Sequence, residues 1–178
     1  MSLNSYKQKR EFSKTPEPKG KIKNSNEKLI FVVQEHHASH LHWDFRLEIN
    51  GVLKSWAIPK EPPTAKGIKR LAIQVEDHPL EYANFEGKIP EGNYGAGIVK
   101  IWDKGNYELI NAEGDPFGKE NSKTPRAYPE TFFKKMFTNG KIEVILDGKK
   151  LKGKFALIKT SYGKTDEQKK KSWLIMKI

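Results

Sequence analysis

Short segments in which hydrophobic and polar residues alternate follow one another along most of the chain. Leu41–Ile49 alternates strictly, which is typical of a strand with one buried face. Gly and Asn separate this segment from similar ones. The expected strands are 29–34, 41–49, 52–58, 70–76, 98–102, 107–110, 142–146, 154–159 and 173–178. So many short strands predict a mainly β protein, either an antiparallel barrel or a sandwich.

Few helical segments are expected. Pro129–Asn139 is predicted to form a short helix that ends at Gly140. Residues 104–106 contain Lys-Gly-Asn and are expected to form a turn between two strands. Residues 111–126 and 161–172 are expected to form mobile loops, because they are polar and lack periodicity.

The chain length and the polarity of its start predict its domain organisation. With 178 residues, the chain is close to the size of one domain. Residues 1–28 are polar and basic, which favours a flexible extended arm over a packed element. We therefore expect an arm over 1–28 and one folded domain over 29–178.

One hairpin can be predicted in register. Asn50-Gly51 favours a two-residue type I′ turn, which would pair the two flanking segments directly. Phe45 would then face Trp56, on the hydrophobic side of the hairpin. Asp44 and Arg46 would lie on the polar side, opposite small residues that leave space above them.

Composition adds a positive charge and excludes several classes of site. Lys and Arg number 33 against 22 Asp and Glu, a formal charge of +11. A surplus of this size attracts polyanions, of which nucleic acid is the commonest. The chain has no cysteine, which excludes disulfides and thiolate ligands. It has neither a signal peptide nor a membrane-length apolar run, so we expect a cytoplasmic protein with no membrane partner.

The polar side of the hairpin carries residues that suit a metal ion. His42 and Asp44 point the same way on one strand, and His36 lies at the end of the preceding strand. Two imidazoles and one carboxylate leave open coordination positions and suit Mn²⁺, Zn²⁺ or Fe²⁺. The spacing is not diagnostic, and a solvated face with ordinary hydrogen bonds is the alternative interpretation.

Further residues in this region suit phosphate chemistry. The planar guanidinium of Arg46 can bind two phosphate oxygens. His78 can contact a phosphoryl oxygen or transfer a proton, and Tyr82 can donate a hydrogen bond to the same oxygens. Lys60 and Arg70 are weaker candidates, because cations at strand ends are often only solvated. The glycines around residue 95 precede a strand, so they predict a tight turn and no P-loop.

Two other functional classes fit these residues less well. A non-catalytic nucleic-acid-binding barrel would bind in a salt-sensitive way without metal-dependent turnover. An iron oxygenase with a 2-His-1-carboxylate site would need Fe²⁺ and a small organic cosubstrate. The net charge and Arg46 favour a phosphate-bearing substrate over this second class.

Several long blocks of the sequence resemble one known family. These blocks are KREFSKTPEP near the start, Gln34–Lys60, Arg70–Gly87, Ile89–Gly105, Lys150–Thr160 and the closing WLIMKI. Together they resemble the 3′-phosphoesterase domain of bacterial and archaeal DNA ligase D, which serves non-homologous end joining. The resemblance covers almost the whole chain and is to the stand-alone versions of the domain.

The resemblance implies a compact antiparallel β-barrel and a Mn²⁺-dependent activity, with other divalent transition metals also suitable. Such domains remove a 3′-terminal ribonucleoside and then the remaining 3′-phosphate, leaving a 3′-hydroxyl. The substrates would be DNA or RNA–DNA primer–template 3′ ends. A separate ligase and polymerase would act beside the enzyme at the nucleoid.

The resemblance also implies residue roles. His36, His42 and Asp44 match the family's metal ligands. Arg46 and His78 match the groups that hold the scissile phosphate, and Tyr82 matches a tyrosine of the phosphomonoesterase step. Supporting positions are matched by Gln34, Lys60, Arg70, Glu76, Arg10, Glu11 and Glu17. Two departures occur: Glu11 stands where relatives often carry Asp, and His37 offers a competing imidazole beside the first ligand.

Overall fold

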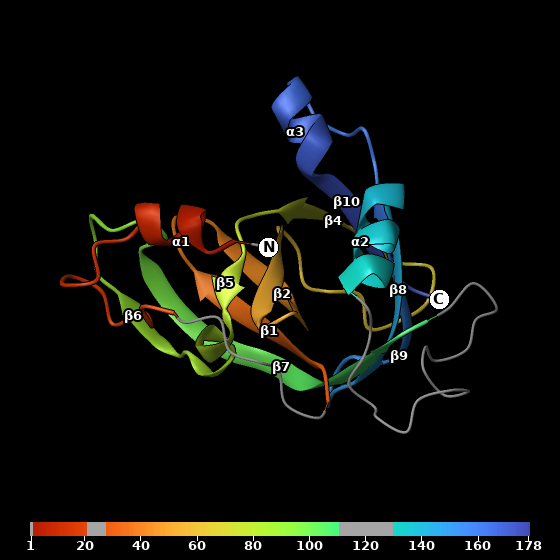
Figure 1. The fold of residues 1–178 in the computed structure, drawn as a ribbon, viewed down its shortest axis with the longest axis horizontal. Helices are drawn as coiled ribbons and strands as arrows, with labels where there is room; N and C mark the ends of the chain where they lie inside the picture. Colours follow the sequence, from red (N-terminus) through yellow and green to blue (C-terminus); the bar gives the residue numbers. More distant parts are fainter. Residues whose placement is uncertain (1, 21–27, 111–129) are drawn as a thin grey trace.

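Eight antiparallel strands close into a barrel in the computed structural model, which describes residues 2–20, 28–110 and 130–178. The strand order is β1-β2-β3-β4-β10-β9-β8-β7, and β7 pairs with β1 to complete the circle (Figure 1). The strands are β1 (Ile30–His37), β2 (Leu41–Ile49), β3 (Val52–Ile58), β4 (Lys69–Gln74), β7 (Gly97–Leu109), β8 (Lys141–Asp147), β9 (Lys152–Lys159) and β10 (Ser172–Lys177). The predicted mainly β antiparallel barrel is confirmed.

Shorter elements lie outside the barrel. Two short strands, β5 and β6, pair with β3 and β7, and in Figure 1 they lie near α1 at one end of the molecule. The bounds are α1 (Asn4–Gln8), β5 (His78–Pro79), 3₁₀ helix η1 (Leu80–Asn84), β6 (Gly87–Ile89), α2 (Glu130–Asn139) and α3 (Asp166–Lys171). Helix α2 confirms the expected helix, and Gly140 follows it with φ +74°. In the described residues, no helix has the length and apolar character needed to cross a bilayer.

The predicted hairpin has the predicted register. Asn50 and Gly51 have φ values of +50° and +73°, as a type I′ turn requires. Phe45 pairs with Trp56, and Asp44 pairs with Ala57. The hairpin therefore presents one hydrophobic and one polar face, as the alternation predicts.

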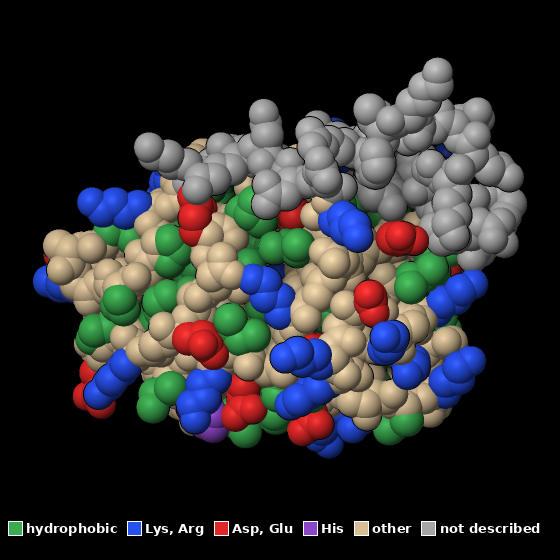
Figure 2. All heavy atoms as spheres, turned by 90° about the horizontal axis from the view of Figure 1, so that it is seen from below, with side chains coloured by type: hydrophobic (Ala, Val, Ile, Leu, Met, Phe, Trp, Pro, Cys, Tyr) green, Lys and Arg blue, Asp and Glu red, His purple; other side chains and the backbone are tan. Residues whose placement is uncertain are grey.

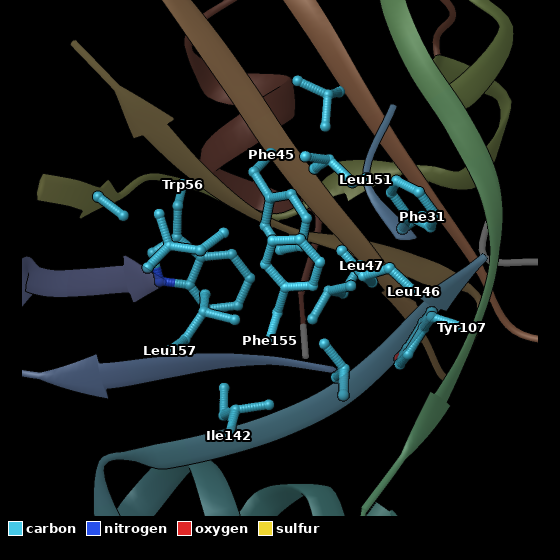
Figure 3. Packing of buried hydrophobic residues seen from close by; sticks show 14 of the residues in the cluster. Phe31, Phe45, Leu47, Trp56, Tyr107, Ile142, Leu146, Leu151, Phe155 and Leu157 are labelled. Carbon is cyan, nitrogen blue, oxygen red and sulfur yellow. The ribbon is translucent and has the colours of Figure 1, made fainter. Parts of the chain in front are cut away.

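Both faces of this hairpin are covered. The inner face joins the main core, where Phe45, Trp56 and Phe155 are among the fully buried side chains (Figure 3). A second cluster, which includes Tyr6 and Tyr82, covers part of the outer face. Burial of each large side chain contributes roughly 1.5–3 kcal/mol. The core thus holds the barrel, while the outer face is available to position polar groups.

The start of the chain packs where an extended arm was expected. Within residues 2–20, Leu3 and Tyr6 are buried. The hydroxyl of Tyr6 donates a hydrogen bond to the Pro18 carbonyl over 2.7 Å, and its ring meets that of Tyr82 edge-on. The aromatic ring of Tyr6, within an otherwise polar stretch, explains this packing. The division into 1–28 and 29–178 stays a prediction.

The turn expected at residues 104–106 is absent, because these residues lie inside the single long strand β7. Gly105 pairs with Phe31 of β1. A Cβ atom on Gly105 would overlap the carbonyl oxygen of Asp147 at the end of β8. The glycine therefore permits a close approach of two strands and does not make a turn.

Part of the loop expected at residues 161–172 is helical. Thr165 caps α3 by accepting from the backbone N–H of Gln168, whose side chain accepts from the Thr165 backbone N–H in return. This reciprocal capping box is readable in the sequence as Thr-x-x-Gln. The other expected loop, 111–126, lies outside the described residues.

Candidate active site and metal centre

The three predicted metal ligands lie together on the outer face of β1 and β2. His36 pairs directly with His42 across the two strands, and Asp44 follows His42 by two residues. Oδ2 of Asp44 lies 3.7 Å from His36 Nδ1 and 3.8 Å from His42 Nε2. One ligand atom from each residue lies within 4.8 Å of the other two. The cross-strand pairing and the two-residue period produce this cluster.

Backbone carbonyls fix which nitrogen of each imidazole faces the cluster. His36 Nε2 lies 2.9 Å from the Gly95 carbonyl oxygen, and His42 Nδ1 lies 2.9 Å from the His40 carbonyl oxygen. A carbonyl only accepts, so each of these nitrogens carries the proton and donates. The lone pairs of His36 Nδ1 and His42 Nε2 are then free to bind a cation. Such partners are typical of imidazoles that hold a metal ion.

Asp44 is ionised in this environment. Burial alone would raise the pKa of its carboxyl group. The positive charge of Arg46 opposes burial and holds the pKa of the carboxyl group well below its usual range. The cluster therefore offers two imidazole nitrogens and one carboxylate, a donor set that fits a divalent transition cation such as Mn²⁺.

His37 is excluded from the cluster by the strand period. It follows His36 directly, so its side chain points to the opposite side of β1. There His37 Nε2 lies 2.5 Å from Glu35 Oε1. The competing imidazole suggested by the sequence is thus bonded elsewhere.

Arg46 lies beside the cluster with one donor group unused. Its Nε donates to Gln34 Oε1 over 2.8 Å, and its Nη2 donates to Asp44 Oδ2 over 3.1 Å. Its Nη1 is buried, and within the described residues it has no hydrogen-bond partner. Gln34 is itself held by donating to the Tyr82 and Phe85 carbonyls, each over 2.9 Å. The guanidinium is therefore fixed, with a buried donor that a phosphate oxygen could satisfy.

His78 is a neutral imidazole with a defined proton. Its Nδ1 lies 2.9 Å from the Glu76 carbonyl oxygen and therefore donates to it, which leaves Nε2 to accept from Arg10 Nη2 over 3.3 Å. Burial, with the nearby charges of Arg46 and Arg10, lowers the pKa of His78 well below 6.5. Its Nε2 can therefore accept a proton at neutral pH.

Tyr82 packs between these two groups as a neutral phenol. Its ring lies 4.9 Å from the Arg46 guanidinium carbon and 4.9 Å from the His78 ring. Burial raises the pKa of its hydroxyl well above 10. The hydroxyl therefore keeps its proton and can serve as a hydrogen-bond donor.

The start of the chain brings a second group of charges to His78. Arg10 Nε donates to Glu17 Oε1 over 2.8 Å, and Arg10 Nη1 lies 3.3 Å from Glu76 Oε1. The side chains of all three residues are almost fully buried. Arg10, Glu17 and Glu76 were expected as supporting residues, and the structure places them next to His78.

For three other expected residues, the described part of the chain gives no contact with the cluster, and their roles stay predictions. Glu11 is exposed and pairs with Lys14 over 2.9 Å. Lys60 is exposed just after β3. Arg70 donates to the Glu61 carbonyl and shares a strand face with Ala72, which lies in the main core. Asp44 lies on the opposite face of the sheet, so Arg70 points away from it.

Two neighbours of the site were not expected from the sequence. Lys9 Nζ lies 2.9 Å from Glu76 Oε2, 3.2 Å from the Tyr94 hydroxyl and 4.5 Å from the centre of the Tyr94 ring. Tyr94 remains about half exposed, at 49%. The contact joins residues 85 positions apart, and neither position has a local signal that could have revealed it.

The surplus of basic side chains is not gathered into a single patch on the face drawn in Figure 2. Figure 2 shows a face on which basic, acidic and hydrophobic side chains are interspersed. Attraction of a polyanion to this face would therefore be weak and unspecific.

Comparison of the sequence with known proteins identifies the same family as the resemblance described above. Residues 34–159 match the family model described as the DNA Ligase D 3′-phosphoesterase domain. The chain is 44% identical over 177 residues to the multifunctional non-homologous end joining protein LigD of Pseudomonas aeruginosa. It is 44% identical over 160 residues to the multifunctional non-homologous end joining DNA repair protein LigD of Mycobacterium tuberculosis, and 43% over 173 residues to LigD of Mycolicibacterium smegmatis.

These matches cover 98%, 89% and 97% of this chain, respectively. They cover 18%, 18% and 20% of the relatives, so the chain spans about a fifth of their length. The matched residues include all three metal-ligand candidates as well as His78 and Tyr82. The chain belongs to the DNA ligase D 3′-phosphoesterase domain family.

Proposed function

We propose that this chain is a metal-dependent 3′-phosphoesterase that prepares DNA ends for repair. It removes a 3′-terminal ribonucleoside from a primer strand and then the 3′-phosphate that is left, so that a 3′-hydroxyl results. The observation that carries the proposal is the buried, unpartnered Nη1 of Arg46 beside the His36, His42 and Asp44 cluster. An unsatisfied cationic donor next to three metal-ligand atoms suits a phosphate group.

His36, His42 and Asp44 would hold the cation, for which we propose Mn²⁺. A bound divalent cation supplies Lewis-acid stabilisation of charge on the phosphoryl oxygens. Arg46 Nη1 donates to one of these oxygens, and its other contacts keep the guanidinium in place. Because the donor is already fixed and buried, little reorganisation accompanies the build-up of charge.

In the first step the oxygen of a water molecule attacks the phosphorus, the bond from phosphorus to the 5′-oxygen of the terminal nucleoside breaks, and that oxygen takes up a proton as the nucleoside leaves. If the neighbouring ribose 2′-hydroxyl attacks instead, a 2′,3′-cyclic phosphate forms, and water then opens it to the 3′-phosphate. His78 Nε2 accepts a proton when Arg10 turns from it towards the phosphate. In the phosphomonoesterase step, water attacks the phosphorus, the bond from phosphorus to the 3′-oxygen breaks, inorganic phosphate leaves and the 3′-oxygen takes up a proton. The Tyr82 hydroxyl donates a hydrogen bond to the terminal phosphate in this step.

The substrates we propose are primer–template 3′ ends of DNA or RNA–DNA. The relatives are named for non-homologous end joining, a process in which DNA ends are joined. A separate ligase and polymerase would use the 3′-hydroxyl that this reaction supplies.

A gel assay on 5′-labelled primer–templates tests the function. One primer ends in two ribonucleotides and a second ends in a 3′-phosphate, each incubated with Mn²⁺ or with EDTA. We expect shortening and loss of phosphate only with Mn²⁺. Asp44→Ala should lower the rate at least about 100-fold, more than loss of a group that only orients a ligand.

A pair of histidine variants provides the matched control. His42→Ala removes a proposed ligand, whereas His37→Ala removes an imidazole on the opposite side of β1 that is bonded to Glu35. His42→Ala should abolish activity, and His37→Ala should stay within about twofold of the parent chain. Tight DNA binding without product under Mn²⁺, Mg²⁺ or Zn²⁺ would overturn the proposal in favour of a non-catalytic binding barrel.

A further inference from the structure

A groove on the outer face of the barrel lies in line with the metal-ligand cluster. It has a volume of about 910 Å³ and lies between α3, the loop before it and the adjoining strands. Leu71 and Ile73 of β4, with Ser172 of β10, form its floor. In Figure 1, α3 stands away from the barrel next to β4 and β10. No residue of this groove takes part in the reaction proposed above.

The strand register connects the groove to the cluster. Asp44 pairs with Ala57, Ala57 pairs with Ile73, and Ile73 pairs with Ser172. Paired residues of adjacent strands share a face of the sheet, so these four lie in one row on the outer face. Adjacent strands are about 4.8 Å apart, which places Ile73 about 10 Å from Asp44 along the row.

The surface between the cluster and the groove is partly exposed. Ala57 and Ile73 are only half buried, and Ala57 carries a small side chain. A polymer with one end at the cluster could therefore lie over Ala57 and enter the groove. A distance of about 10 Å corresponds to about three steps of a nucleic-acid strand in B-form, at 3.4 Å each.

The wall of the groove carries the groups that bind single strands of nucleic acid. Tyr162 is 66% exposed, the largest exposed fraction among the large hydrophobic side chains of the described residues. Four lysines and two acidic residues lie between positions 161 and 171. Lys164 lines the groove, and no ion pair links it to another described residue. An exposed aromatic ring beside lysines is typical of base-stacking sites.

The loop that presents Tyr162 is held in place. Gln168 Oε1 accepts from the Lys164 backbone N–H over 2.8 Å, and Gly163 lies so close to α3 that a Cβ on it would be 2.7 Å from Gln168 Cβ. The backbone of the wall next to Tyr162 is therefore a built part of the fold, held by α3.

We propose that this groove binds the primer strand two to four nucleotides upstream of the 3′ end that is processed, with the strand unpaired from its template at these positions, one base stacked on Tyr162 and a phosphate near Lys164. The proposal rests on the proposed function, because it assigns the cluster to the 3′ end. It makes substrate length a determinant of binding: primers that reach the groove bind more tightly than shorter ones.

Photocrosslinking tests the groove without any need for turnover. An all-deoxy primer–template carries one 5-bromodeoxyuridine at each of the first eight positions from the 3′ end, in separate preparations. We expect crosslinks to the peptide containing Tyr162 from positions two to four only. Crosslinks at other positions, or from the template strand only, overturn the assignment.

Kinetics with groove variants provide the second test. Tyr162→Ala should raise KM about tenfold for long primers, the effect of losing one stacked base, and leave kcat unchanged. It should not affect a dinucleotide substrate, and Tyr162→Phe should behave as the parent chain. Lys164→Ala should reduce the slope of log KM against log salt by about one. Lys152→Ala, a highly exposed lysine on β9, is the control for lost charge and should not change the slope.

The outcomes separate this proposal from the proposed function. Crosslinking through Tyr162 without any product would support binding in the groove and contradict the proposed reaction. Activity without that crosslink would support the proposed reaction and contradict binding in the groove. Activity with an unchanged KM in the Tyr162→Ala variant would have the same meaning.

Discussion

Asp44 is the residue on which the candidate site depends most. A single oxygen, Oδ2, faces both imidazoles and also accepts from Arg46 Nη2 over 3.1 Å. The carboxylate therefore offsets the charge of a buried guanidinium as well as completing the metal-ligand cluster. Removal of a charge that is buried and paired leaves its partner uncompensated, which is costly. Loss of Asp44 would consequently disturb phosphate binding and metal binding together.

His78 predicts a pH dependence of stability. Its pKa is lowered by burial in the folded chain, so the unfolded chain binds the proton more readily between the folded pKa and about 6.5. The contribution of neutral His78 to the free energy of unfolding is therefore fully present above pH 6.5 and falls as the pH drops below it. The loss approaches about 1.4 kcal/mol for each pH unit in that window.

Thermal unfolding of the parent chain and of His78→Gln, measured with EDTA from pH 8 to pH 5, checks this dependence. The difference in stability between the two chains should shrink as the pH falls below 6.5, because Gln does not titrate. A difference that stays constant, or grows towards acid, would contradict a neutral buried His78.

The sequence allowed the metal-ligand cluster to be predicted but not the contacts from the start of the chain. Strand alternation puts His42 and Asp44 on one face, and pairing of consecutive strands brings His36 to them. By contrast, the Arg10 and His78 contact joins residues 68 positions apart in the chain. No turn or periodic pattern links such positions, so only the packed structure, or resemblance to a family, could bring them together.

At the scale of elements, features that depend on a few neighbouring residues could be predicted from the sequence, whereas features that depend on tertiary contacts could not. The Asn50-Gly51 turn fixed the register of the β2–β3 hairpin, because its chemistry is contained in two residues. Lys-Gly-Asn at 104–106 predicts a turn that the structure does not have, because the reason for Gly105 lies in β8, far along the chain. Hydrophobic periodicity does not predict helix α3, because none of its residues is buried.

Gly105→Ala tests the role assigned to that glycine. The added methyl group would overlap the Asp147 carbonyl, so β7 and β8 would have to separate. We expect a loss of about 3 kcal/mol or more in the free energy of unfolding, as for other overpacked backbone contacts. Urea denaturation measures it.

Gly67→Ala is the matched control. A Cβ at Gly67 would meet nothing within 4 Å, although φ is +83°. Only backbone strain is added there, at a cost of about 1 kcal/mol. Equal losses in the two variants would show that packing against β8 is not what requires a glycine at position 105.

At the scale of the whole molecule, the charge of +11 has consequences for binding. If the proposed nucleic-acid substrate binds through its phosphates, it would exchange counterions for lysine and arginine side chains, and we expect its affinity to fall as salt rises. Four phosphate contacts would weaken binding by roughly 100-fold between 50 and 200 mM salt.

Fluorescence anisotropy of a labelled primer–template, titrated at several NaCl concentrations, measures this slope. A neutral osmolyte at matched osmolality is the control and should have little effect. An affinity that changes less than threefold over the same range of salt would contradict binding through the phosphate backbone.

Strand β2 gives the domain an unusual degree of mutational freedom. Trp43, Phe45 and Leu47 serve the core, while His42, Asp44 and Arg46 alternate with them on the other side. Selection can therefore act on odd and even positions of one strand almost independently. A library that varies Asp44 and Arg46 together, so that neither buried charge is left without its partner, would explore new metal and phosphate preferences while the core-facing residues of β2 stay unchanged.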